Sequence, residues 1–83
     1  MLRFKYKELL SEKEFTEDRK ITLDEVAQKT GITRTTLSRI SSVRGYNTKT
    51  RNIDKLCCYF DCAVEKLIQY IPDKDIIKNP RMR

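Results

Sequence analysis

The chain has 83 residues, of which 18 are lysine or arginine and 12 are aspartate or glutamate, for a formal net charge of +6. A chain of this length forms one domain with one compact core, which leaves too little material for a deep catalytic cleft. It contains no histidine, no glycine-rich phosphate loop and no run of about 18 apolar residues. These features argue against an enzyme and against a membrane protein.

The positive charge is concentrated in the middle of the chain. Residues 23–52 carry six basic and two acidic side chains, and no acid occurs between Glu25 and Asp54. The stretches before and after this segment each carry six basic and five acidic side chains. A basic middle between nearly neutral ends predicts a local surface for a polyanion. On charge alone, a solvated basic face without a partner remains the alternative.

The three cysteines, Cys57, Cys58 and Cys62, lie close together in the sequence. An odd, clustered set without a secretory leader predicts reduced thiols and a cytoplasmic protein. A zinc site would need four ligands, and the chain offers neither histidine nor a second cysteine pair. No metal and no cofactor are therefore expected, and Cys57 is expected to serve as a small apolar core residue.

Hydrophobic periodicity predicts five short helices and therefore an all-α fold. The first helix is expected over residues 4–14, with Tyr6 and Leu9 on the face that packs inward. A charged connection follows it. Its two apolar residues, Phe15 and Ile21, are expected to hold the ends of the connection against the core.

The fourth and fifth helices are expected over residues 49–60 and 63–70, because apolar residues recur there at intervals of three and four. A helix-turn-helix domain is thus expected over residues 1–72. Residues 73–83 form a mostly charged tail, expected to be frayed unless a partner orders it.

The second and third helices have the strongest local signals. Thr22 followed three residues later by Glu25 is a capping-box pattern, in which each side chain bonds the other residue's backbone N–H. Gly31 is placed to take the left-handed conformation that ends a helix. Thr33 is placed to cap the third helix, expected over residues 34–42.

The spacing of apolar and small residues across residues 23–42 predicts how these two helices meet. Ala27, on the second helix, leaves room where the third helix crosses it, and Gly31 allows the tight turn four residues later. Ile32 fills the corner, and Leu37 and Ile40 are the large apolar residues that anchor the following helix. This pattern is typical of a helix-turn-helix.

On these residues the chain resembles the lambda-repressor/Cro-like helix-turn-helix regulators, and most closely a subgroup of small single-domain bacterial and phage proteins. The resemblance covers about residues 4–72 and rests on the segments 21–27, 30–40 and 53–57. It implies a five-helix domain with the third helix in the major groove of DNA. Leu23 stands where many members carry a glutamine that touches a phosphate, so this contact is not carried over.

The resemblance also implies the residues that contact DNA. The expected base-reading residues follow the turn, where arginine can bind guanine and a threonine methyl can pack on thymine: Arg34, Thr35, Thr36, Ser38 and Arg39. The expected phosphate-binding residues flank this helix on both sides: Thr33, Ser42, Arg44, Tyr46, Asn47, Thr48 and Lys49.

The sequence therefore predicts a DNA-binding transcription regulator, more specifically a repressor that occludes a promoter. No small-molecule ligand is expected, and the sequence shows no clear seam for a homodimer, so the oligomeric state stays open. Two alternatives remain. One is an antitoxin-like protein-interaction module that uses the same fold with a protein partner. The other is a non-specific architectural binder, against which the polar variety of the third helix argues.

Overall fold

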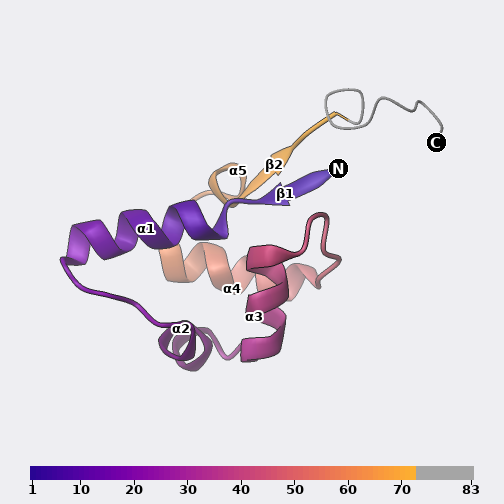
Figure 1. The fold of residues 1–83 in the computed structure, drawn as a ribbon. Coiled ribbons are helices and arrows are strands. Elements are labelled where there is room, and N and C mark those ends of the chain that lie inside the picture. Colours follow the sequence, from indigo (N-terminus) through magenta and orange to yellow (C-terminus); the bar gives the residue numbers. More distant parts are fainter. Residues whose placement is uncertain (73–83) are drawn as a thin grey trace.

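The computed structural model describes residues 1–72, which form five helices and two short strands (Figure 1). The elements follow in the order β1 (Leu2–Phe4), α1 (Tyr6–Glu17), α2 (Leu23–Thr30), α3 (Arg34–Ser42), α4 (Thr50–Phe60), α5 (Val64–Leu67) and β2 (Ile68–Tyr70). The predicted all-α class with five helices is confirmed. The predicted tail, residues 73–83, lies outside the described residues. Among residues 1–72, no helix is long and apolar enough to cross a membrane.

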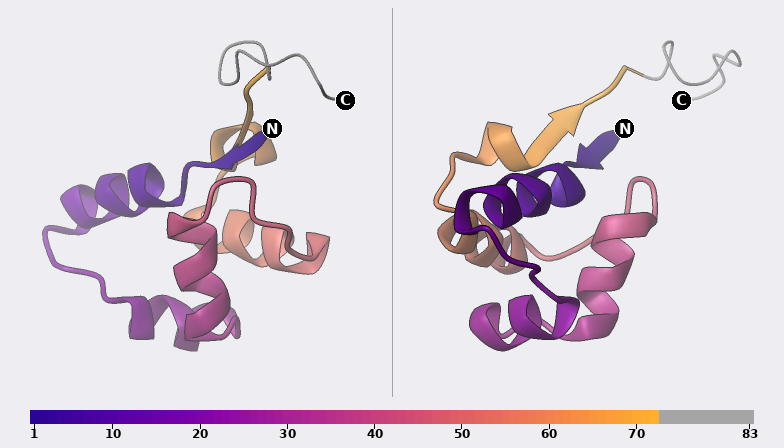
Figure 2. Two further views of the ribbon diagram at one scale, coloured as in Figure 1. Left: turned by 45° about the vertical axis from the view of Figure 1, so that its right-hand side comes forward. Right: turned by 60° about the vertical axis from the view of Figure 1, so that its left-hand side comes forward.

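One core joins all five helices. In Figures 1 and 2, α1 lies over α4, and α3 runs transverse to α2. The side chains buried between them come from every helix and from both connections that flank α2: Tyr6, Ile21, Val26, Ile32, Leu37, Ile40, Leu56 and Leu67. Each fully buried aliphatic side chain stabilises the fold by roughly 1.5–3 kcal/mol relative to an exposed one.

Helix α1 begins and ends later than the sequence predicts. It runs three residues past Glu14 and stops at Asp18, which has the left-handed φ of 54°. The extension carries Phe15 to the outer side of the helix, where it is 88% exposed, so its predicted place in the core is wrong. Ile21 is buried as predicted, and its backbone N–H donates to the Glu14 carboxylate over 2.8 Å.

The two strands were not predicted, and they replace the expected ends of the first and fifth helices. β1 pairs antiparallel with β2, with Leu2 opposite Tyr70 and Phe4 opposite Ile68. Backbone bonds on either side extend the pairing, including one from Ile71 N–H to the Met1 carbonyl over 2.8 Å. The fifth helix therefore ends at Leu67, and the two ends of the domain lie side by side (Figure 2).

Candidate nucleic-acid interface

Of the two hydrogen bonds of the predicted capping box at the start of α2, only one forms. The Thr22 hydroxyl accepts a hydrogen bond from the Glu25 N–H over 3.2 Å. The Glu25 carboxylate, in contrast, takes two bonds from the Arg19 guanidinium, over 2.8 and 2.6 Å. These bonds, together with the positive charge of Arg19, hold the pKa of Glu25 below its usual value. Glu25 therefore joins the connection to α2 and does not complete the capping box.

The turn between α2 and α3 has the predicted geometry. Gly31 has φ of 78°, and its N–H donates to the Ala27 carbonyl over 2.8 Å. A residue with a side chain would be strained at this φ. Ile32 is 4% exposed and fills the corner of the turn. The Thr33 hydroxyl then caps α3 by accepting from the Thr36 N–H over 3.2 Å.

Helix α3 is held to the domain by one narrow side. Leu37 is fully buried and Ile40 is 2% exposed, so both predicted anchors are confirmed. The short anchored stripe leaves the opposite side of the helix in solvent. The sequence predicted this arrangement because the helix carries only two large apolar residues.

Four of the five predicted base-reading residues lie together. Arg34, Thr35, Ser38 and Arg39 are all exposed and line one shallow hollow with Leu23 of α2. Thr36 is separate from this group, since it is only partly exposed and its hydroxyl is hydrogen-bonded to the Thr33 hydroxyl over 3.0 Å. The outward side of α3 thus presents two guanidinium groups and two hydroxyls.

An acidic neighbour holds Arg34 in the free protein. Its Nε lies 2.7 Å from Oδ1 of Asp24 in the first turn of α2. The two side chains are 66% and 70% exposed, and an ion pair in such a setting contributes at most about 1 kcal/mol. The pair therefore orients the guanidinium and can be broken at little cost in free energy. Within residues 1–72, no ion pair involves Arg39.

A second hollow gathers most of the predicted phosphate-binding residues beside the N-termini of α3 and α4. Five of the seven predicted residues line it, together with residues of the turn and of α4 that the sequence reasoning missed. Its lining is Gly31, Ile32, Thr33, Thr36, Tyr46, Asn47, Thr48, Lys49, Arg51, Asn52 and Lys55. It contains three cationic side chains and no acidic one. We call it the cationic hollow.

The missed residues are Arg51, Asn52 and Lys55 of α4. Asn52 donates from its amide to the Thr48 hydroxyl over 2.9 Å, which links the loop to the helix. Lys55 reaches back to the turn, where its Nζ lies 3.7 Å from the position that a Cβ on Gly31 would take. The sequence carried a signal for them, because the first two turns of α4 contain two basic residues, Arg51 and Lys55, and the first turn contains no acid.

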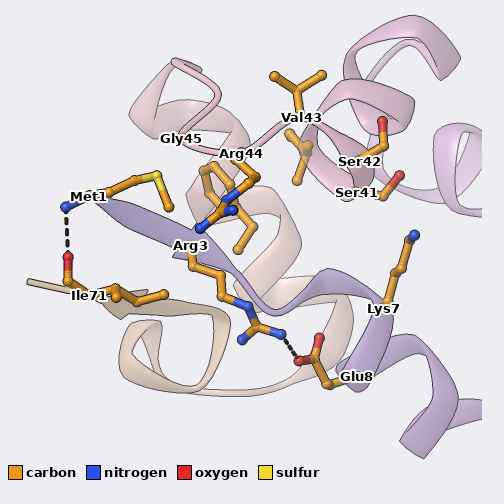
Figure 3. A pocket seen from close by; sticks show the side chains of 12 residues that line it. Met1, Arg3, Lys7, Glu8, Ser41, Ser42, Val43, Arg44, Gly45 and Ile71 are labelled. Carbon is orange, nitrogen blue, oxygen red and sulfur yellow. Dashed lines mark hydrogen bonds and ion pairs between the residues drawn. The ribbon is translucent and has the colours of Figure 1, made fainter. Parts of the chain in front are cut away.

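The remaining two predicted phosphate-binding residues, Ser42 and Arg44, lie in a different hollow, between the end of α3 and β1. Figure 3 shows Arg44 beside Arg3 and Met1, with Lys7 on the α1 side. Arg3 is paired with Glu8. The Ser42 hydroxyl donates to the Ser38 carbonyl over 2.7 Å, so in this conformation its hydrogen is committed to α3.

The cysteines lie at the end of α4, away from both hollows of the helix-turn-helix. The Cys62 N–H donates to the Cys57 carbonyl over 3.0 Å where the helix ends. Burial and the neighbouring Cys62 raise the pKa of the Cys57 thiol. Cys57 packs against the core as a neutral side chain, as predicted. Within residues 1–72, no group of three histidine, cysteine or acidic residues is arranged to hold a metal ion.

Comparison with known families agrees with this geometry. The Cro/C1-type HTH DNA-binding domain matches residues 13–73, which include α2, the turn, α3 and α4. No curated protein and no solved structure matches the chain. The matched range covers most of the 83 residues and bears out the predicted likeness to lambda-repressor/Cro-like regulators. The chain belongs to the family of Cro/C1-type HTH DNA-binding domains.

Proposed function

We propose that this protein is a sequence-specific transcription repressor that binds duplex DNA with α3 in the major groove. The observation that carries the proposal is the exposed side of α3. Arg34, Thr35, Ser38 and Arg39 face solvent together, while Leu37 and Ile40 fix the helix to the core. The major groove admits an α-helix, and these side chains supply the donors and methyl group that read base edges there.

Each side chain of this group has a distinct role in the proposal. Arg39 and Arg34 each donate two hydrogen bonds to O6 and N7 of a guanine. Arg34 leaves Asp24 to do so, which costs little because the pair is exposed. The Thr35 methyl packs on a thymine methyl, and Ser38 bonds a base edge. Thr36 was predicted in the same role, and its bond to Thr33 suits it better to the phosphate side.

The cationic hollow binds the DNA backbone beside the groove. Lys49, Arg51 and Lys55 neutralise phosphates, and the two helix N-termini that meet there add backbone N–H donors and positive dipole ends. The contacts to the same DNA backbone are completed by Thr33, Tyr46, Asn47 and Thr48. Arg44, with Ser42 beside it, contacts a neighbouring phosphate. These contacts fix the register of α3 on the duplex and carry no sequence information themselves.

Repression follows from occupancy. A copy bound across a promoter blocks access to it sterically. Two copies on one operator would place their α3 helices in successive turns of the groove, about 34 Å apart. We therefore propose that the protein binds a two-fold operator as a homodimer.

The first experiment is an in vitro selection from a random duplex pool at about 150 mM salt, where non-specific binding is weak. We expect one enriched motif with guanines in each half-site. Arg39→Ala should then weaken binding to that motif by about 1–3 kcal/mol and relax the preference for one guanine. Binding to a scrambled duplex should not change.

Two outcomes contradict the proposal. If a folded sample enriches no motif, the protein is not an autonomous sequence-specific regulator. If Arg39→Ala weakens binding to the selected and scrambled duplexes equally, Arg39 contacts phosphate and α3 does not read bases through it.

A further inference from the structure

Two of the large exposed apolar side chains lie together on the two-stranded sheet. Among residues 1–72, five such side chains are exposed, and Leu2 and Tyr70, with 52% and 67% exposure, lie directly opposite each other on paired strands. Val64, with 51% exposure, lies one helical turn before β2, and its carbonyl accepts from the Ile68 N–H. The other two, Phe15 and Val43, lie in α1 and in the loop after α3.

Strand geometry places the apolar residues of the sheet on one side. Side chains alternate between the two faces of a strand, and cross-strand partners share a face. Leu2, Phe4, Ile68 and Tyr70 therefore form one face, which we call the sheet face. Its inner end, Phe4 and Ile68, packs against the core. Its outer end consists of Leu2, which begins β1, and Tyr70, which ends β2. These ends of the two strands extend beyond the helices (Figures 1 and 2).

The sheet face has no charge in a chain whose net charge is +6. The charged residue of β1, Arg3, belongs to the opposite face, where it binds the Gln69 amide oxygen over 3.1 Å and pairs with Glu8. The adjacent helix α5 carries one acid and one base, Glu65 and Lys66. Two positively charged copies repel each other over most of their surfaces, and they can approach closely at a neutral apolar patch.

We propose that the sheet face is the homodimer interface, on which a second copy of this chain packs its own sheet face about a two-fold axis beside Leu2 and Tyr70. The inference deepens the proposed function, since it names the surface that joins two DNA-binding copies. A two-fold interface brings the same patch of both subunits together, and an apolar, uncharged patch is complementary to itself.

The outer edge of β2 is a less suitable contact than the face of the sheet. A strand added along the outer edge of β2 would need backbone donors at alternate residues. Pro72, two residues after Tyr70, has no N–H to offer. The Ile68 N–H already donates to the Val64 carbonyl. The outer edge of β2 is therefore a poor template for another strand.

The size of the patch sets the expected strength. A stable interface buries roughly 800 Å² per partner, whereas the whole chain exposes 6021 Å². Two three-residue strands contribute only part of such an area, so association should depend on concentration in solution. On DNA with two half-sites, the second copy binds at a high effective concentration, and the same contact gives cooperative binding.

Sedimentation velocity of the full chain over a wide concentration range tests the interface. We expect the wild-type mass to rise toward that of two chains, and Tyr70→Glu to remain monomeric over the same range. Phe15→Glu is the matched control. It introduces the same charge at an 88% exposed apolar side chain near the C-terminal end of α1, and that end of the helix points away from the sheet (Figure 1). This variant should associate like the wild type.

A charge-reversal mixture tests the two-fold arrangement. Tyr70→Lys alone should also be monomeric, and an equimolar mixture of Tyr70→Lys with Tyr70→Glu should recover the heavier species. Circular dichroism of each variant checks that it is folded. A wild type that stays monomeric at every concentration overturns the proposal. Association of Tyr70→Glu equal to wild type, or a mixture that does not recover, also overturns it.

DNA binding separates this inference from the proposed function. On a duplex with one selected half-site, Tyr70→Glu should bind like the wild type, whereas on two half-sites it should lose the cooperative gain. If no variant shows sequence-specific binding, the proposed function fails, and the sedimentation data still decide the dimer interface.

Discussion

At the scale of single residues, two tyrosine hydroxyls, those of Tyr6 and Tyr59, are buried without a partner among the described residues. The Tyr6 side chain is 1% exposed, and its ring meets the Phe60 ring edge-on with centroids 5.8 Å apart. Among residues 1–72, its hydroxyl has no hydrogen-bond partner. Burial is the main cause that raises the pKa of Tyr6 to about 12, and Tyr59 and Glu14 add to it. The packing of the ring therefore outweighs the cost of its polar atom.

Tyr6→Phe should leave the free energy of unfolding unchanged or raise it by up to about 1 kcal/mol at neutral pH, because it removes a buried polar atom and keeps the ring. Below pH 10 the Tyr6 hydroxyl is protonated in both states. Between the ordinary tyrosine pKa of 10.0 and the native value of about 12, the unfolded chain releases this proton first. The wild type should therefore lose stability as the pH rises through this window, and Tyr6→Phe should lose less.

Urea unfolding of both proteins below pH 10 and near pH 12 measures this difference. Equal alkaline losses in wild type and Tyr6→Phe would show that Tyr6 titrates normally in the native protein.

At the scale of elements, the helix-turn-helix was predictable because its signals are local. The Thr22 cap, the left-handed Gly31 and the Thr33 cap each depend on residues within four positions of one another. The two strands have no such local determinant. β1 carries an alternating pattern, yet the spacing of apolar residues near Leu67 and Ile68 equally fits a helix. Whether these residues form a strand or a helix is decided by pairing between segments 66 residues apart, as for Arg3 and Gln69.

The residues of α4 that line the cationic hollow, which the sequence did not predict, give a further prediction. Lys55→Ala should weaken binding to selected and scrambled duplexes alike, because the cationic hollow binds phosphates. The slope of log K against log salt should fall by about 0.9 for each phosphate that the variant no longer neutralises. Lys49→Ala, in the same hollow, should behave in the same way.

Lys66→Ala is the charge-matched control for both variants, since Lys66 is an exposed lysine of α5 outside the cationic hollow. It should leave the salt slope unchanged on a duplex with one half-site. A Lys55→Ala slope equal to that of the wild type would remove α4 from the interface.

At the scale of the whole molecule, the sequence predicted which residues lie on and beside α3. It did not predict which of them share a hollow. Four of the five base-reading candidates share one hollow, because consecutive turns of a single helix determine their positions. The phosphate-binding candidates split between two hollows. That division depends on how the loop after α3 lies against β1 and α4, and no local pattern encodes the path of this loop.

The extent of the folded domain gives the last prediction. The family match begins at residue 13, yet Tyr6 belongs to the core and β1 pairs with β2. A chain of residues 13–83 would lose β1, half of α1 and a buried aromatic. Loss of such a side chain alone costs about 3–5 kcal/mol, a large share of the roughly 5–15 kcal/mol that stabilises a domain.

We expect the chain of residues 13–83 to show little helical circular dichroism and no cooperative melting. A chain of residues 1–72 is the control and should melt like the full protein, as the predicted boundary requires. A cooperative transition of the 13–83 chain near the wild-type temperature would show that the sheet and the first turns of α1 are dispensable.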